Sequence, residues 1–286
     1  MKPIFGIDIT ENKHNETVNG SEFIVKTVSQ QRSEDLDTKR EELNDTVKKS
    51  KFPLWLQIIY FITGVYAGIV ICAVIGNLGE TGLAQMLKNA PVLIISGLIC
   101  GVIWLILLAV SKTREKKVLE EDNAEGKVEQ LDLNVKGIYA EMGVPSDADS
   151  VDVLMQIYKV KDGEVVAKTP GIQLSAYINI DCKAYVENDA LHIAELENVY
   201  AFPLSEIKSI KTVNKRICVP FWNKEEAPKK GIYKQYKMTV NNMGMVYCKP
   251  YYILELSHNN EEYGIYFPCY ELPVFERLTG LNAEIQ

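Results

Sequence analysis

The basic side chains between Lys208 and Lys237 are the residues of this 286-residue chain whose spacing most suggests a binding chemistry. Nine Lys and Arg residues lie in this stretch against two glutamates, and its centre, 219–231, has the Pro and aromatic content of a long loop. A lysine near an anionic membrane contributes about 1 kcal/mol of attraction, and an exposed Trp suits the membrane interface. The stretch therefore predicts a surface for lipid headgroups or an acidic partner, formed by Lys215, Arg216, Trp222, Lys224, Lys229, Lys230, Lys234 and Lys237. The alternative is a solvated hairpin whose Phe221 and Trp222 fold back onto their own domain.

Residues that could carry catalysis do not form a recognisable motif. None of the three histidines, His14, His192 and His258, lies beside a Ser or Cys motif, and neither a Gly-rich phosphate loop nor HExxH occurs. Cys269 is either a reactive thiol or, as we favour, a small buried apolar residue. The six cysteines contain no CxxC pair. We therefore expect no enzymatic activity, no metal and no cofactor.

Small residues at a spacing of four form two stripes that could pack helices. The set consists of Gly64, Gly68, Cys72 and Gly76, followed by Gly97 and Gly101. This spacing places each set on one face of a helix, where missing side chains let two backbones approach closely. The stripes therefore predict packing of the two helices against each other, and less strongly a homo-oligomer or another protein partner.

These glycines lie in two apolar runs, Leu54 to Gly76 and Val92 to Val110, that contain no Asp, Glu, Lys, Arg or His. A helix of the first run is roughly 34 Å long, enough to cross a bilayer core. We therefore predict a transmembrane hairpin over residues 53–111. The polar groups within the runs are neutral, which disfavours a channel or transporter.

Basic residues flank the two runs on their outer sides. They are Lys48, Lys49, Lys51, Lys112, Arg114, Lys116 and Lys117, whereas the connection between the runs holds Lys88. Because cytoplasmic ends of membrane helices accumulate Lys and Arg, we expect a cell-membrane protein with two spans and both termini in the cytoplasm.

The segments beside the hairpin have their own patterns. The β-prone runs Ile4 to Ile9 and Phe23 to Val28 predict that residues 1–32 form a β-hairpin docked on the C-terminal domain, or else are disordered. Residues 33–52 predict an amphipathic helix, and residues 112–150 a helix and linker. An apolar seam in the second helix (Val128, Leu131, Val135, Ile138 and Met142) predicts antiparallel pairing with a stripe of the first (Leu36, Leu43 and Val47); the alternative is packing on the C-terminal domain.

Residues 151–286 read as a series of short strands separated by turn residues such as Asn188-Asp189 and Asn259-Asn260. No helix long enough for a parallel crossover lies between them. We predict an antiparallel sandwich or barrel that a helix, Glu271 to Leu281, closes at one end. The whole chain is then of the α+β class.

The runs Ala184 to His192 and Tyr200 to Lys208, the latter with a Pro-Leu-x-x-Ile step, are followed by further strands and a closing helix. This pattern resembles bacterial pleckstrin-homology-like domains, and the segment Gly264 to Leu281 resembles part of a group of uncharacterised two-span bacterial membrane proteins. The resemblance covers the last third to half of the chain and implies a binding fold without a catalytic motif. The extra strand pair at Val151 to Val166 departs from a minimal seven-stranded version.

The net charge of −7 is spread along the chain, and nothing in it points to nucleic acid. The expected function is a binding or scaffold module at the cytoplasmic face that recruits lipid headgroups or a protein partner. Two alternatives stay open at this point: an accessory subunit of a transport or secretion complex, and a membrane-anchored enzyme with an unrecognised site.

Overall fold

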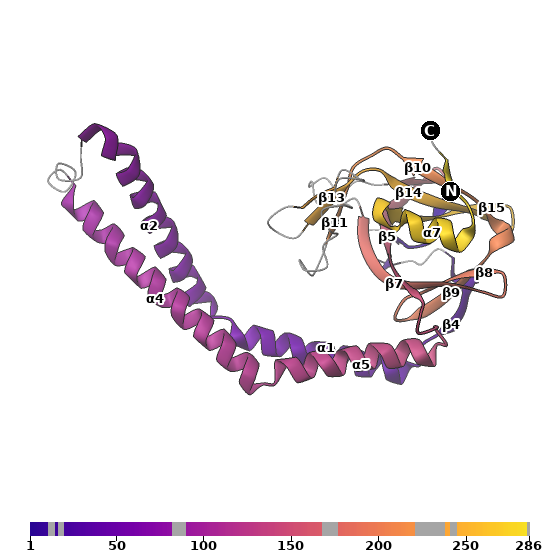
Figure 1. The fold of residues 1–286 in the computed structure, drawn as a ribbon, viewed down its shortest axis with the longest axis horizontal. Helices are drawn as coiled ribbons and strands as arrows, with labels where there is room; N and C mark the ends of the chain where they lie inside the picture. Colours follow the sequence, from indigo (N-terminus) through magenta and orange to yellow (C-terminus); the bar gives the residue numbers. More distant parts are fainter. Residues whose placement is uncertain are drawn as a thin grey trace. The chain divides into compact units, whose positions relative to one another are not determined.

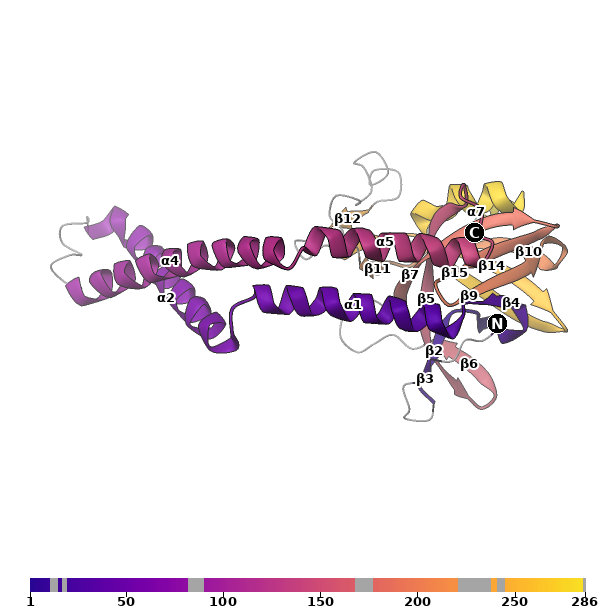
Figure 2. The same ribbon diagram turned by 90° about the horizontal axis from the view of Figure 1, so that it is seen from below.

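The computed structural model describes residues 1–10, 15–16, 20–81, 90–167, 177–220, 238–240 and 245–284. The chain divides into two compact units, one of Met1–Ser33 with Lys136–Gln286 and one of Glu34–Val135. The first holds the sheets and the second the long helices (Figures 1 and 2). The chain is thus α+β, with a large, mostly antiparallel sheet and two apolar helices.

The helices of the second unit follow the apolar and polar patterns of the sequence. They are α1 (Gln30–Ser50), α2 (Leu54–Thr81), α4 (Pro91–Glu121) and α5 (Ala124–Glu141), of which α1 and α5 extend into the first unit. Pro91 occupies the first turn of α4, where its missing N–H costs nothing. The helix expected after residue 112 is divided instead, because α4 continues to Glu121 and Asn123 adopts φ 49° before α5 begins.

Helices α1 and α5 run side by side in opposite directions, as Figure 2 shows. Lys127 Nζ donates to Thr46 Oγ1 at 2.8 Å, and Asn134 donates to the Asp35 carboxylate near the other end. The predicted antiparallel pairing is therefore present. Its apolar seam is incomplete, however, because Val47 and Val128 are exposed and Thr46 is buried. Leu36 of the predicted stripe is buried, and the polar contacts of Lys127 and Asn134 add to the pairing.

The end of α5 meets the β domain. Ile138 and Met142 are buried. Burial raises the pKa of Tyr139, and the nearby Asp181 and Glu195 carboxylates raise it further. Both arrangements considered for this helix therefore occur: α5 pairs with α1 along its length, and its C-terminal end also packs on the β domain.

The main sheet has the strand order β16-β10-β14-β15-β5-β7-β8-β9-β4. Its strands are β4 (Ile24–Thr27), β5 (Asp149–Lys161), β7 (Tyr177–Glu187), β8 (Ala190–Ala194), β9 (Asn198–Pro203), β10 (Ile207–Val213), β14 (Tyr251–His258), β15 (Glu261–Pro268) and β16 (Ala283–Glu284). Four shorter strands pair beside this path: β1 (Lys2–Pro3), β2 (Gly6–Asp8), β3 (Asn15–Glu16) and β6 (Glu164–Ala167). Among the described strands no pairing joins β16 to β4, so a closed barrel is not part of the observed pairing.

A second, three-stranded sheet has the order β11-β13-β12, formed by β11 (Ile217–Pro220), β12 (Thr239–Val240) and β13 (Met245–Cys248).

Two of the turns have the geometry that their residues predict. Asn188 and Asp189 between β7 and β8, and Asn259 and Asn260 between β14 and β15, all have positive φ. Two successive residues with positive φ make a turn whose twist matches that of the strands, which explains why these predicted hairpins form.

The two N-terminal β-prone runs do not pair with each other, so that part of the prediction was wrong. β1 and β2 run parallel to β15 and β5, whereas β4 runs antiparallel to β9. Ile4, Phe5 and Phe23 are buried in the domain core. Phe23 lies 5.0 Å from the Phe202 ring and 5.3 Å from the Tyr263 ring. The runs join the large sheet because it buries their apolar side chains, which an isolated hairpin does not.

The closing helix α7 (Leu272–Thr279) follows β15 and lies beside strands of the main sheet (Figure 1). Phe275 is fully buried and stacks on Phe267 at 4.2 Å between ring centroids. Gly280 ends the helix at φ 73°, a conformation that favours glycine. The helix is shorter than the predicted Glu271 to Leu281 because Cys269–Glu271 form a short 3-10 turn.

Candidate functional site

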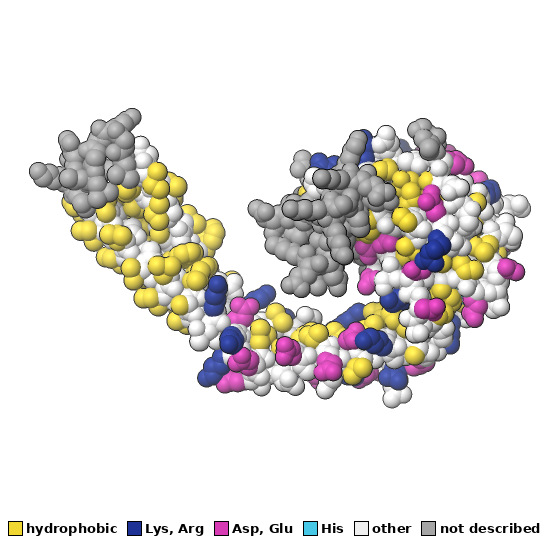
Figure 3. Space-filling model, in the orientation of Figure 1, with side chains coloured by type: hydrophobic (Ala, Val, Ile, Leu, Met, Phe, Trp, Pro, Cys, Tyr) yellow, Lys and Arg dark blue, Asp and Glu magenta, His cyan; other side chains and the backbone are white. Residues whose placement is uncertain are grey.

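The outer surface of α2 and α4 is strongly apolar. Large aliphatic and aromatic side chains lie exposed along both helices; among them are Leu54, Phe61, Ile69, Val92 and Leu98, which are 61–78% exposed. Figure 3 shows hydrophobic side chains over much of the hairpin surface. In the most apolar 18-residue stretch of each helix, only 11% of α2 and 6% of α4 is buried. The core helix of a soluble protein, in contrast, is mostly buried. Both helices are long and apolar enough to span a membrane.

Two of the predicted glycines pack the hairpin. A Cβ added at Gly64 would lie 2.6 Å from Nε1 of Trp104, and one at Gly97 would lie 2.5 Å from Cγ1 of Val70. Each glycine therefore accepts a large side chain from the other helix. Trp104 also stacks on Tyr60 at 5.8 Å.

One polar contact joins the same helices. The hydroxyls of Tyr66 and Ser96 share a hydrogen bond of 2.8 Å. Sequence reasoning missed Val70, Trp104 and this pair, because finding them requires the register of α2 against α4, which apolar periodicity leaves undefined.

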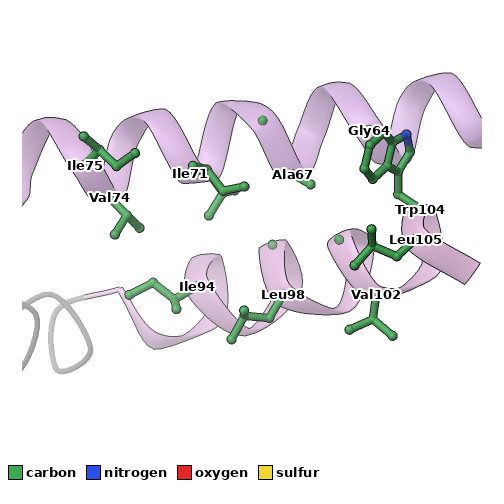
Figure 4. A pocket seen from close by; sticks show the side chains of 14 residues that line it. Gly64, Ala67, Ile71, Val74, Ile75, Ile94, Leu98, Val102, Trp104 and Leu105 are labelled. Atoms are coloured by element: carbon green, nitrogen blue, oxygen red, sulfur yellow. The ribbon is translucent and has the colours of Figure 1, made fainter. Parts of the chain in front are cut away.

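The other predicted small residues do not bring the two helices into close contact. A Cβ at Gly68 or Gly76 would meet nothing within 4 Å, one at Gly101 would meet only the Ala67 Cβ at 3.8 Å, and Cys72 is exposed. A groove of about 840 Å³ lies between the helices here (Figure 4). Its lining is apolar: Gly64, Ala67, Gly68, Val70, Ile71, Val74, Ile75, Ile94, Gly97, Leu98, Gly101, Val102, Trp104 and Leu105. The stripes thus divide into a packed part and an open part.

The basic stretch of the β domain is partly neutralised by its own sheet. Lys208 lies 3.4 Å from Glu262, and Lys211 lies 3.4 Å from Glu255. Neither lysine belonged to the predicted binding set. The pairing of β10 with β14 brings Lys211 to Glu255, and β15, which pairs with β14, supplies Glu262; the positive total of the stretch did not indicate either ion pair.

Of the predicted binding residues, Lys215 and Arg216 are described and exposed, between β10 and β11. The Arg216 guanidinium lies 4.5 Å from the centre of the Tyr247 ring and donates to Thr239 Oγ1 at 3.3 Å. Trp222, Lys224, Lys229, Lys230, Lys234 and Lys237 lie outside the described residues.

Cys269 is fully buried, as we expected of a small apolar residue. Its thiol donates a hydrogen bond to the Cys248 sulfur, which raises the pKa of Cys269 and lowers that of Cys248. Cys269 is therefore held as a neutral thiol and is a poor nucleophile. Sequence spacing did not indicate this contact, because β13 and the turn before α7 meet only in the folded domain.

A group of acidic residues anchors α7 to β5. Glu271 accepts a hydrogen bond from the Asp152 N–H at 3.0 Å, and the Tyr270 hydroxyl donates to Asp152 Oδ2 at 2.5 Å. Arg277 pairs with Asp149 at 2.5 Å. Burial raises the pKa of Glu271 to about 8, although the Asp152 N–H opposes that shift. Each of these groups has a structural partner, and no group of three or more potential ligands in the described chain is arranged to hold a metal ion.

Comparison of the chain with protein-family models, with curated proteins and with solved structures finds no match. The resemblance to bacterial pleckstrin-homology-like domains therefore stays a prediction from the residue pattern.

Proposed function

We propose that this chain is a two-span membrane protein that holds a binding or scaffold domain at the cytoplasmic face. The exposed apolar surface of α2 and α4 carries the proposal. Water solvates such a surface poorly, whereas the hydrocarbon interior of a bilayer solvates it well. Both helices also satisfy their backbone hydrogen bonds internally, as a membrane span requires.

The orientation within the proposed membrane follows from the flanking charges. Lys49 and Lys51 precede α2, and Lys112 and Arg114 follow the apolar part of α4, whereas the connection between the spans holds Lys88. This asymmetry favours both termini, and hence the β domain, on the cytoplasmic side.

The proposed activity of the β domain is recognition rather than catalysis, in a pleckstrin-homology-like fold. An antiparallel sheet with a closing C-terminal helix supports that fold. Exposed Lys215 and Arg216 support an anionic ligand, either a lipid headgroup or an acidic protein surface.

One observation favours a second candidate, an accessory subunit of a larger membrane complex. Gly68 and Gly76 lie open on α2, where a helix of another protein could approach closely.

Extraction of membranes with alkaline carbonate tests the anchor. We expect the full chain to stay in the membrane pellet, and a reporter that is active only outside the cytoplasm to stay silent when fused after Gln286. Release of the chain by carbonate would overturn the anchor, and an active reporter would overturn the orientation.

A pull-down in mild detergent tests recognition. We expect Lys215→Gln with Arg216→Gln to reduce retained lipid or partner, and the matched change Lys208→Gln with Lys211→Gln to leave it nearly unchanged, because those two lysines are already paired with glutamates. Loss of a partner on changing Gly68 and Gly76 to Leu, without any effect of the basic residues, would favour the accessory subunit.

A further inference from the structure

The basic residues at the polar end of the hairpin fall into two classes. One class is neutralised by carboxylates of the same helical unit, in the pairs Lys48–Asp45 at 3.2 Å, Lys49–Asp122 at 3.7 Å, Lys116–Glu120 at 3.7 Å and Lys117–Glu121 at 3.6 Å. The other class consists of Lys51, Lys112 and Arg114, which have no ion pair within the described part of the chain.

The second class lies at the boundary between the apolar and the charged surface. Lys51 is in the turn between α1 and α2, and Lys112 follows the long apolar run of α4 that ends at Val110. Lys and Arg side chains gather where the apolar covering of the hairpin ends (Figure 3). Trp55, in the first turn of α2, is 61% exposed. Trp at this depth is typical of the membrane–water interface.

Backbone contacts fix this boundary. An Arg114 NH2 group donates to the Lys49 carbonyl at 3.3 Å, which ties α4 to the end of α1. The turn that carries Lys51 is held by its N–H, which donates to the Lys48 carbonyl at 3.2 Å. Gln57 Nε2 also donates to the Phe52 carbonyl at 2.6 Å. This contact uses one of the five N–H donors of the Arg114 guanidinium, at the carbonyl two positions before Lys51.

We propose that Lys51, Lys112 and Arg114 form a ring of basic groups around the polar end of the hairpin, which we call the basic collar and which binds the phosphates of anionic phospholipids. The proposal rests on the membrane anchor proposed above. Arg binds phosphate through two parallel hydrogen bonds, and Lys adds point charge. A lipid is the occupant because the collar adjoins apolar helix surface, so that one molecule can place its phosphate on the collar and its acyl chains on the hairpin.

The collar has an expected strength. Each basic side chain near an anionic leaflet strengthens attraction by roughly fivefold, so three of them give a preference on the order of 100-fold before screening by salt. The preference must weaken as ionic strength rises, because the collar is exposed to solvent.

The test uses the full chain in nanodiscs of phosphatidylcholine with a minor fraction of phosphatidylglycerol, followed by native mass spectrometry of the lipids that stay bound. The collar variant carries Lys51→Gln, Lys112→Gln and Arg114→Gln. The control variant carries Lys48→Gln, Lys116→Gln and Lys117→Gln, which removes the same charge from the same region but only from lysines that already have carboxylate partners.

We expect the collar variant to lose at least about tenfold of the preference for phosphatidylglycerol, while the control variant keeps most of it. Equal loss in both variants would overturn the collar, because net charge alone would then explain the preference. An unchanged preference in the collar variant would also overturn it. Failure of the native chain to enter nanodiscs would instead contradict the membrane anchor, so the two proposals fail separately.

A second measurement leaves all three collar residues unchanged, so that a folding defect of the collar variant cannot affect it. Trp104→Phe and Trp222→Phe leave Trp55 as the single Trp of the chain. Brominated phosphatidylglycerol should quench Trp55 fluorescence more strongly than brominated phosphatidylcholine, and added inorganic phosphate should not remove that difference. Equal quenching by the two lipids would contradict the collar, and loss of the difference with inorganic phosphate would show a site for free phosphate instead.

Discussion

The β domain and the α2–α4 hairpin contain the same kinds of apolar side chains and expose them in opposite ways. In the β domain Tyr200, Phe202 and Phe275 are fully buried. In the hairpin Phe61 is 69% exposed and Val92 is 78% exposed. The β domain supplies its own apolar surroundings, and it recruits the N-terminal strands to do so. The hairpin buries only the narrow face between its two helices, and its other apolar side chains are exposed to the surroundings, which we propose are lipid. Burial rather than composition therefore distinguishes the two regions.

The largest effect is expected from truncating one large apolar side chain in each region to Ala and comparing the free energies of unfolding. Phe275→Ala removes a ring that stacks on Phe267 in the core, which should cost about 3–5 kcal/mol of the free energy of unfolding of the β domain. Leu98→Ala removes a side chain that is 66% exposed on α4 and should leave the β domain unchanged. Denaturant unfolding of the full chain in detergent, followed by near-ultraviolet circular dichroism of the tyrosines, measures both. Similar losses from the two variants would remove the contrast between the regions.

The next largest effect, on membrane insertion, is expected when a lysine is introduced into each region. Leu98→Lys places an ammonium group in the middle of a proposed span and should oppose membrane insertion by about 2.5–3.5 kcal/mol. Val166→Lys places the same group on a β strand side chain that is 39% exposed, and insertion should be unaffected. The fraction of chain that resists carbonate extraction reports insertion. Unimpaired insertion of Leu98→Lys would indicate that this face of α4 is in water.

Local pattern was enough to predict most elements but not their partners. The hairpins β7–β8 and β14–β15 form at the predicted turn pairs, because alternating apolar residues and turn pairs such as Asn188-Asp189 are local signals. The parallel pairing of β2 with β5 joins residues about 150 positions apart, and no local signal encodes that choice. The same limit applies to the candidate sites.

The hairpin and the basic stretch illustrate this limit at single residues. Gly64 and Gly68 look alike in sequence, yet only Gly64 faces a bulky side chain, that of Trp104. Lys211 and Lys215 look equally available, yet Lys211 is paired with Glu255 across the sheet. Register between helices or strands decides each case, and register depends on contacts that are distant in sequence.

A glycine pair tests the packed and open parts of the hairpin. A Cβ at Gly97 would press on Val70 close to the α2 backbone, so Gly97→Ala should separate the helices at a cost of about 1–3 kcal/mol. Gly68→Ala meets open space and should be nearly neutral. Trp104 fluorescence, with Trp55 and Trp222 changed to Phe, reports the separation, because Trp104 packs on Gly64 and Tyr60. A shift of emission with Gly68→Ala instead would place the packed face elsewhere.

The final prediction is a pH dependence that belongs to the β domain alone. Glu271 has a pKa of about 8 in the folded chain, against 4.5 for an ordinary glutamate, because burial disfavours its charged form and Asp152, Asp181 and Asp149 lie nearby. A raised folded pKa contributes stability that is complete below about pH 4.5 and is lost as pH rises toward 8. Within that window the loss is at most about 1.4 kcal/mol per pH unit.

Glu271→Gln keeps an acceptor for the Asp152 N–H but does not titrate, so its unfolding free energy should fall less between about pH 5 and pH 8 than that of the native chain. Denaturant unfolding of both proteins at several pH values measures the difference, which hairpin variants such as Gly68→Ala should not alter. Parallel pH profiles for the native and Glu271→Gln chains would show that the carboxyl titrates normally and that water reaches it in the folded domain.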